Sequence, residues 1–143
     1  MAKDRPSRAD FATFRPMQTR WMDNDIYGHM NNVVHYSLFD TAVNGWLMDQ
    51  GLLDPTISES YGLVVETGCT YHAQLRYPEP VHAGLRISQI GKSSVRFEIG
   101  LFADGENLAA ANGFFIHVYV NRESQRPVPV EGARRTAFET LVM

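Results

Sequence analysis

One stretch of the chain, residues 33–50, has the spacing of a long amphipathic helix, and it constrains the fold more than any other feature. Its apolar positions recur every three to four residues: Tyr36, Phe39, Val43, Trp46 and Leu47. Asn31 or Asn32 is suited to cap the start of this helix, and Gly51 is placed to end it. A helix face that carries such large side chains must be buried against a broad apolar surface.

The remaining segments are mostly typical of β-strands. Apolar and polar side chains alternate in four of them: 63–77, 81–90, 95–102 and 107–121. Turn-forming residues separate these four: Pro78-Glu79-Pro80, Gly91-Lys92-Ser93-Ser94 and Asp104-Gly105. A rougher alternation over 12–22 predicts a first strand, and residues 131–142 are predicted to form a short terminal helix.

This order of one strand, one long helix and four consecutive strands predicts an α+β fold. Consecutive strands with short connections form an antiparallel meander, and the helix would lie on one face of that sheet. We expect residues 12–143 to form a single domain, preceded by a flexible segment over residues 1–11. A sheet that is covered on one side leaves exposed edges and a partly apolar outer face, which favours dimerisation.

Composition excludes several classes of function. The net charge of −3 is not that of a nucleic-acid-binding protein, and no apolar run approaches the roughly 20 residues of a membrane span. The single cysteine, Cys69, rules out an internal disulfide or a cysteine zinc cluster, and its place in a predicted strand favours a buried thiol. Because the N-terminus is polar and lacks the apolar core of a signal peptide, we expect a cytoplasmic protein.

Five polar side chains gather just before the predicted helix: Asp23, Asp25, His29, Asn31 and Asn32. Aspartate, asparagine and glycine are also the residues that turns and helix caps use, so a structural role is one interpretation. One or two caps would suffice for one helix, however. Unpaired N–H groups at a helix start can polarise a carbonyl, and a nearby carboxylate can act as base or nucleophile. The second interpretation is therefore an active site.

The sequence from Trp21 to Tyr36, WMDNDIYGHMNNVVHY, resembles a known family signature. Hotdog-fold acyl-CoA thioesterases of the 4-hydroxybenzoyl-CoA thioesterase group, and their relatives that act on acyl carrier protein, carry the pattern aromatic-x-D-x-D-x-x-G-H-V-N-N-x-x-Y. The resemblance covers residues 12–121. It implies a hotdog fold, in which an antiparallel five-stranded sheet wraps around one long central helix.

The resemblance also implies roles for individual residues. The catalytic carboxylate of the family falls on Asp25, and its oxyanion donor, a backbone N–H at the start of the central helix, falls near Asn32. His29 and Asn31 match the other polar positions of the signature. Plant-type carrier-protein thioesterases place an asparagine two residues after the aspartate. Tyr27 stands there in this chain, which departs from their amide-assisted scheme, and we count Tyr27 among the substrate-binding candidates.

Further substrate-binding candidates lie elsewhere in the chain. Other hotdog enzymes complete the site with a residue from a neighbouring subunit, and Glu66 and Thr67 are candidates by position. Tyr36 would line the acyl pocket. Ser93 and Ser94 in the 91–94 turn would meet the phosphates of coenzyme A. The structural alternatives are that Glu66 is an exposed strand carboxylate and that residues 91–94 form a plain hairpin turn.

The predicted activity is hydrolysis of an acyl thioester of coenzyme A or acyl carrier protein, with Asp25 as general base or nucleophile. We expect no cofactor, because coenzyme A is part of the substrate, and no metal, because His35, His72 and His82 lie on different predicted elements. The expected assembly is a homodimer or homotetramer. Two alternatives are a hotdog enoyl-thioester hydratase or dehydratase, whose signature has a different Asp-to-His spacing, and a non-catalytic acyl-CoA-binding protein.

Overall fold

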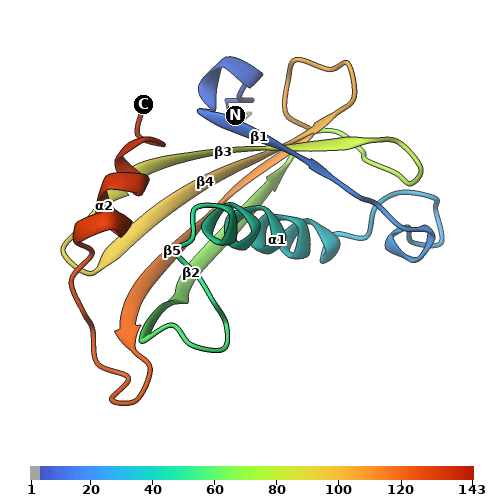
Figure 1. Ribbon diagram of the computed structural model, residues 1–143. Helices are drawn as coiled ribbons and strands as arrows, with labels where there is room; N and C mark the ends of the chain where they lie inside the picture. Colours follow the sequence, from blue (N-terminus) through green and yellow to red (C-terminus); the bar gives the residue numbers. More distant parts are fainter. Residues whose placement is uncertain (1–3) are drawn as a thin grey trace.

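A computed structural model describes residues 4–143 and shows a curved sheet wrapped around one long helix (Figure 1). The strands and helices follow in this order: β1 (Thr13–Met17), α1 (Val34–Asp49), β2 (Ser60–Tyr71), β3 (Val81–Ile90), β4 (Ser94–Ala103), β5 (Ala111–Asn121) and α2 (Gly132–Glu139). Two 3-10 turns, η1 (Arg8–Asp10) and η2 (Trp21–Asp23), precede β1 and α1. The predicted α+β class, with five antiparallel strands and one central helix, is confirmed.

The strand order in the sheet is β1-β3-β4-β5-β2, and every neighbouring pair is antiparallel. The predicted meander is correct for β3, β4 and β5 but wrong for β2, which pairs with β5 instead of β3. Residues 72–80 therefore cross from one side of the sheet to the other. The crossing passes the N-terminal end of α1, where the Met30 N–H donates to the Leu75 carbonyl at 2.7 Å.

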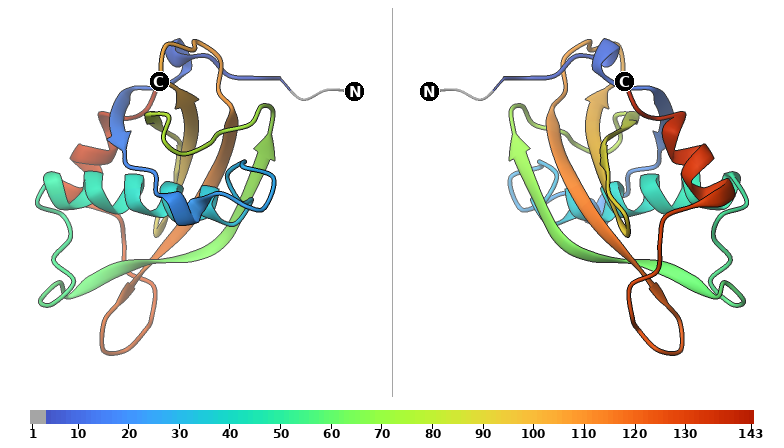
Figure 2. Two further views of the ribbon diagram at one scale, coloured as in Figure 1. Left: turned by 90° about the vertical axis from the view of Figure 1, so that its right-hand side faces the viewer. Right: turned by 90° about the vertical axis from the view of Figure 1, so that its left-hand side faces the viewer.

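Helix α1 lies in the concave face of the sheet (Figure 2). Its buried side chains repeat at helical spacing: His35, Leu38, Phe39, Ala42, Val43, Trp46 and Leu47. The helix ends at Gly51 as predicted. Gly51 has a φ of +71°. The Gly51 N–H donates to the Met48 carbonyl, and the Leu52 N–H donates to the Leu47 carbonyl. These two bonds are those of a Schellman motif, which requires the left-handed conformation that glycine adopts most readily.

The start of α1 differs from the prediction. Its cap residue is Val33 rather than Asn31 or Asn32, and Val33 makes no side-chain capping bond. The reason is an extra turn before the helix, closed by the Val34 N–H to the Asn31 carbonyl at 2.9 Å. The Asn31 side chain serves this turn by accepting from the Val33 N–H at 3.2 Å.

The inner face of the sheet follows the predicted alternation in β3 and β4. Its buried side chains there are Val81, Ala83, Leu85, Ile87, Val95, Phe97, Ile99 and Leu101. The apolar alternation of β5 predicts one face with Phe114, Ile116, Val118 and Val120, but the first three lie on the half-buried outer face and only Val120 is buried. The inner face of β5 carries Phe115, His117 and Tyr119, so this strand buries a histidine and a tyrosine that the pattern did not reveal.

Three predicted strand boundaries are wrong for reasons that lie elsewhere in the chain. β2 stops at Tyr71 because the N–H groups of His72 and Ala73 both donate to the Ala110 carbonyl, which ends the ladder. β5 begins at Ala111 rather than at 107, since Asn107 and Ala109 bond to the N-terminal segment. β1 is shorter than 12–22 because η2 forms instead of its second half.

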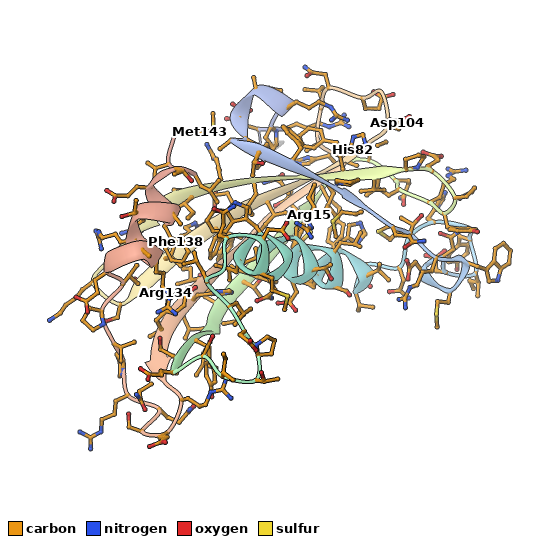
Figure 3. The ribbon with its side chains drawn as sticks, in the orientation of Figure 1. Arg15, His82, Asp104, Arg134, Phe138 and Met143 are labelled. Carbon is orange, nitrogen blue, oxygen red and sulfur yellow. The ribbon has the colours of Figure 1, made fainter. Side chains whose placement is uncertain are left out.

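Residues 6–11 of the predicted flexible segment are held against the sheet and the loop before β5. Phe11 is buried and meets Phe102 edge-on, with ring centroids 5.7 Å apart, and the Arg8 N–H donates to the Asn107 carbonyl. Residues 1–3 of that segment lie outside the described residues. At the other end, α2 confirms the predicted terminal helix, and its buried Phe138 packs against the rings of Trp46, Phe97 and Tyr119 (Figure 3).

Candidate active site

Asp25 sits in a tight turn before α1. Its N–H donates to the His29 carbonyl at 2.7 Å, and its Oδ1 accepts from the N–H groups of Tyr27 at 2.8 Å and His29 at 3.2 Å. Gly28, with a φ of +78°, allows the chain to reverse there. Asp25 Oδ2 has no hydrogen-bond partner within residues 4–143. The carboxylate thus shapes the turn with one oxygen and keeps the other free.

Asp23 has a different environment. It is 2% exposed, and it accepts from the Arg20 N–H at 2.8 Å and from the Arg20 guanidinium at 2.8 and 3.1 Å. Its own carbonyl accepts from the Asn31 N–H at 2.8 Å. Asp23 therefore acts as a structural anchor that ties η2 to the start of α1.

The turn at Asn32 presents one free backbone donor. The Asn32 carbonyl accepts from the Tyr71 hydroxyl at 2.8 Å, whereas the Asn32 N–H makes no hydrogen bond to the described residues. This N–H lies at the N-terminal end of α1, where the helix dipole favours negative charge. The arrangement suits an oxyanion that develops on a bound carbonyl.

Asp25 and Asn32 line the same open pocket, of about 630 Å³. The remaining lining residues come from the turn before α1, from α1 itself, from the end of β2 and from the crossing segment 72–80: Met30, Asn31, His35, Tyr71, His72, Ala73 and Gln74. The crossing segment 72–80 is tied to the opposite wall, because the Asn24 side chain exchanges hydrogen bonds with the Tyr77 backbone. The structure thus brings together three predicted site residues, Asp25, Asn31 and Asn32.

The chain matches the family model of the thioesterase-like superfamily over residues 19–138. It belongs to the thioesterase-like superfamily. The match spans the pocket and most of the fold, and it confirms the resemblance that residues 21–36 indicate.

The chain is also similar to solved structures and to a curated relative. The PA5185 protein of Pseudomonas aeruginosa is 46% identical, with a TM-score of 0.94 and 97% of each chain covered. A thioesterase from Thermus thermophilus, solved with coenzyme A and Zn, is 27% identical, with a TM-score of 0.75 and coverage of 92% of this chain and 95% of that one. The uncharacterized protein YsmA of Bacillus subtilis is 25% identical over 124 residues, which are 85% of this chain and 81% of YsmA.

Three other predicted site residues of this superfamily member do not line the pocket. The backbone of His29 is bonded to Asp25, and its imidazole is half-exposed beside the turn. Tyr27 is 77% exposed on the outside of the same turn. Tyr36 lies on α1, with its ring edge-on to Phe39 at 6.0 Å.

The remaining candidates lie farther along the sheet. Glu66 and Thr67 are exposed on β2, where Thr67 Oγ1 donates to the Phe114 carbonyl at 2.7 Å. Ser94 is aligned through β5 with Leu63, which lies roughly 26 Å along β2 from Tyr71 at the usual strand rise. Ser93 and Ser94 are therefore at the opposite end of the sheet from the Asp25 pocket.

Sequence reasoning did not place His35 in the pocket. His35 follows Asn31 by four positions, so helical spacing could have shown that both share one face. Burial lowers the pKa of His35, an effect that the nearby carbonyls of Asn32 and Asn31 partly offset. Its ring is therefore neutral near pH 7.

The histidines of the described residues form no metal site, and the Cys69 thiol is unsuited to nucleophilic attack. His72 Nε2 lies 2.6 Å from Asn112 Oδ1, and His82 lies 3.9 Å from Asp104 on the loop side of the sheet (Figure 3). Within residues 4–143, no three His, Cys, Asp or Glu side chains gather as a metal site would require. Cys69 is half-buried, and burial raises the pKa of its thiol, which disfavours the reactive thiolate.

No helix in the described part of the chain is both long and apolar enough to cross a membrane.

Proposed function

We propose that this protein hydrolyses an acyl thioester of coenzyme A to a free acid and a thiol. The observation that carries the proposal is that Asp25 and Asn32 line one pocket, and that Asp25 Oδ2 and the Asn32 N–H have no hydrogen-bond partner among residues 4–143. Membership of the thioesterase-like superfamily supports the same reaction.

In the proposed mechanism the thioester carbonyl lies over the N-terminal end of α1. The Asn32 N–H donates to the carbonyl oxygen, and the helix dipole adds to the stabilisation of the negative charge that develops there. Removal of one oxyanion donor costs roughly 100- to 1000-fold in turnover in other hydrolases, so this single N–H carries a large part of the rate.

Asp25 supplies the second part of the chemistry. In one route it deprotonates a water that attacks the carbonyl, and the resulting tetrahedral intermediate collapses with cleavage of the C–S bond. In the other it attacks directly, cleavage of the C–S bond leaves a mixed anhydride, and water then hydrolyses the anhydride. In both routes the released thiolate takes up a proton to give the thiol. Single turnover in oxygen-18 water separates the two routes, because attack of water on the Asp25 side of an anhydride leaves label in the carboxylate. His29 would position the Asp25 turn through its backbone.

We further propose a homodimer as the working assembly, with a homotetramer as the alternative. Large apolar side chains are exposed around the Asp25 turn: Trp21, Met22, Ile26, Tyr27 and Val33. A second copy that covers them would also bring side chains such as Glu66 and Thr67, or the Ser93-Ser94 turn, toward a neighbouring pocket. Cytoplasmic residence stays a prediction from the sequence.

The Asp25→Asn variant tests the proposed function. We expect loss of about 100-fold or more in kcat over a panel of acyl- and aryl-CoA substrates, since the amide can neither accept the proton nor attack. Thiol release measures the reaction.

Asp54→Asn is the matched control. Asp54 also shapes a turn, through Oδ1 and the Thr56 N–H at 2.9 Å, but it lies outside the pocket. Normal turnover in Asp25→Asn, or enoyl hydration without thiol release in the wild type, contradicts the proposal. Tight acyl-CoA binding without any hydrolysis favours a binding protein instead. Hydrolysis of carrier-protein thioesters but not of acyl-CoA would identify acyl carrier protein thioesters as the substrates.

A further inference from the structure

The backbone at Asn32 is held from outside its own turn by the side chain of Tyr71. The Tyr71 hydroxyl reaches from the end of β2, across the pocket wall, and donates to the Asn32 carbonyl at 2.8 Å. The flanking groups are also occupied: the Asn31 N–H donates to Asp23, and the Asn31 carbonyl accepts from Val34. In this bonded turn, the Asn32 N–H is the donor left without a partner among the described residues.

His35 supports the Tyr71 ring in turn. The two rings meet edge-to-face, with centroids 4.7 Å apart and an interplanar angle of 86°. His35 is 4% exposed, and its buried Nδ1 has no hydrogen-bond partner among residues 4–143. This side of the imidazole therefore acts through van der Waals contact and not through a hydrogen bond. Burial of the phenol and the neighbouring Cys69 raise the pKa of Tyr71 to about 12. The hydroxyl therefore remains a donor through neutral and mildly alkaline pH.

We propose that Tyr71 is a positioning residue: by holding the Asn32 carbonyl, it fixes the direction of the Asn32 N–H, and His35 holds the Tyr71 ring in place. The Asn32 N–H shares a peptide plane with the Asn31 carbonyl, which the Val34 N–H holds, and the Asn32 carbonyl belongs to the next plane. The Tyr71 bond fixes that second plane, so rotation about both backbone bonds of Asn32 is restricted. An oxyanion donor is effective only when it points at the position of the developing charge. The inference rests on the proposed hydrolase function and adds the element that aligns its donor.

Tyr71→Phe removes the hydroxyl and keeps the ring. We expect kcat to fall about 10- to 100-fold, because a displacement near 1 Å in an active site can cost about 100-fold in rate. KM should stay within about twofold, since the donor acts mainly on the transition state.

Tyr61→Phe is the matched control. Tyr61 lies at the other end of β2, and its hydroxyl has a hydrogen bond of the same length, 2.8 Å, from Gln125 Nε2. This variant should keep wild-type kcat and KM. Unchanged kcat in Tyr71→Phe overturns the inference, and so does a raised KM at constant kcat, because that result identifies a substrate contact.

A second pair of variants keeps the inference testable if Tyr71→Phe does not fold. His35→Ala removes the support beneath Tyr71 and should lower kcat, whereas His35→Phe restores an aromatic edge and should restore most of it. Equal kcat values for the two variants contradict the supporting role of His35.

A measurement without substrate separates this inference from the proposed function. The backbone amide resonances of Asn32 and Val33 should shift in Tyr71→Phe and stay unchanged in Tyr61→Phe. If Asp25→Asn turns over normally, the hydrolase mechanism fails while the resonances still test the positioning. If Asp25 is essential and the resonances do not move, the positioning role alone is overturned.

Discussion

Asp23 and Asp25 are two positions apart and have identical side chains, but their hydrogen-bond partners give them different roles. Arg20 donates three hydrogen bonds to the Asp23 carboxylate, so its charge is paired and both of its oxygens are engaged. Asp25 meets only backbone N–H groups, and these occupy a single oxygen. A carboxylate can serve chemistry only with a lone pair that faces the reactant, and this favours Asp25 over Asp23 for the proposed reaction.

His117 is a second residue whose surroundings decide its behaviour. It is 3% exposed between the rings of Phe97 and Phe115, and neither ring nitrogen has a partner among the described residues. Burial lowers the pKa of His117 to about 4 from 6.5. As pH falls from 6.5 to 4, His117 becomes protonated in the unfolded chain but stays neutral in the folded chain. The free energy of unfolding therefore decreases over this range.

His117→Phe should remove this acid sensitivity. Between pH 7 and pH 4.5, the wild type should lose about 2 to 3 kcal/mol more of its free energy of unfolding than the variant does. Urea denaturation at the two pH values measures the difference. An equal loss in both proteins would mean that the folded state accommodates the charged imidazole.

At the scale of elements, local signals were predictable and long-range ones were not. The predicted bounds of β3 and β4 are within one residue of the observed ones, because strand alternation and the neighbouring turns depend only on residues close in sequence. The pairing of β2 with β5 depends on contacts such as Ala110 with His72 and Ala73, which no local pattern encodes. The motif located Asp25 and Asn32 for the same reason, whereas Tyr71 reaches Asn32 only through the place of β2 in the sheet.

The end of α1 provides a test at this scale. Gly51→Ala forces a side chain into the left-handed conformation at φ +71°, and we expect the free energy of unfolding to fall by about 1 kcal/mol. Gly51→Asn should recover part of that loss, because asparagine tolerates this conformation better. Thermal or chemical unfolding compares the three proteins, and an alanine variant as stable as wild type would show that the motif can relax.

At the scale of the whole molecule, the two edges of the sheet are unequal. β1 is a short edge of five residues that contains Pro16, whereas β2 is twelve residues long and exposes Leu63, Val64 and Val65. A long apolar edge strand is a template for pairing with another chain, and proline or brevity protects an edge from it. The proposed dimer is therefore expected to form through β2, which would place two sheets side by side.

Val65→Lys tests this arrangement, because a charged side chain at the edge opposes strand pairing. We expect the wild type to sediment as a dimer and Val65→Lys to shift toward the monomer at the same concentration. Leu108→Lys is the control: Leu108 is 42% exposed but lies in the loop before β5, away from the β2 edge, so that variant should remain a dimer. Equal dissociation of both variants would point to general destabilisation, and a dimer unaffected by Val65→Lys would exclude this edge. Because the exposed Ile26 directly follows Asp25 in the chain, weaker hydrolysis in the monomeric variant would place the second copy next to the proposed active site.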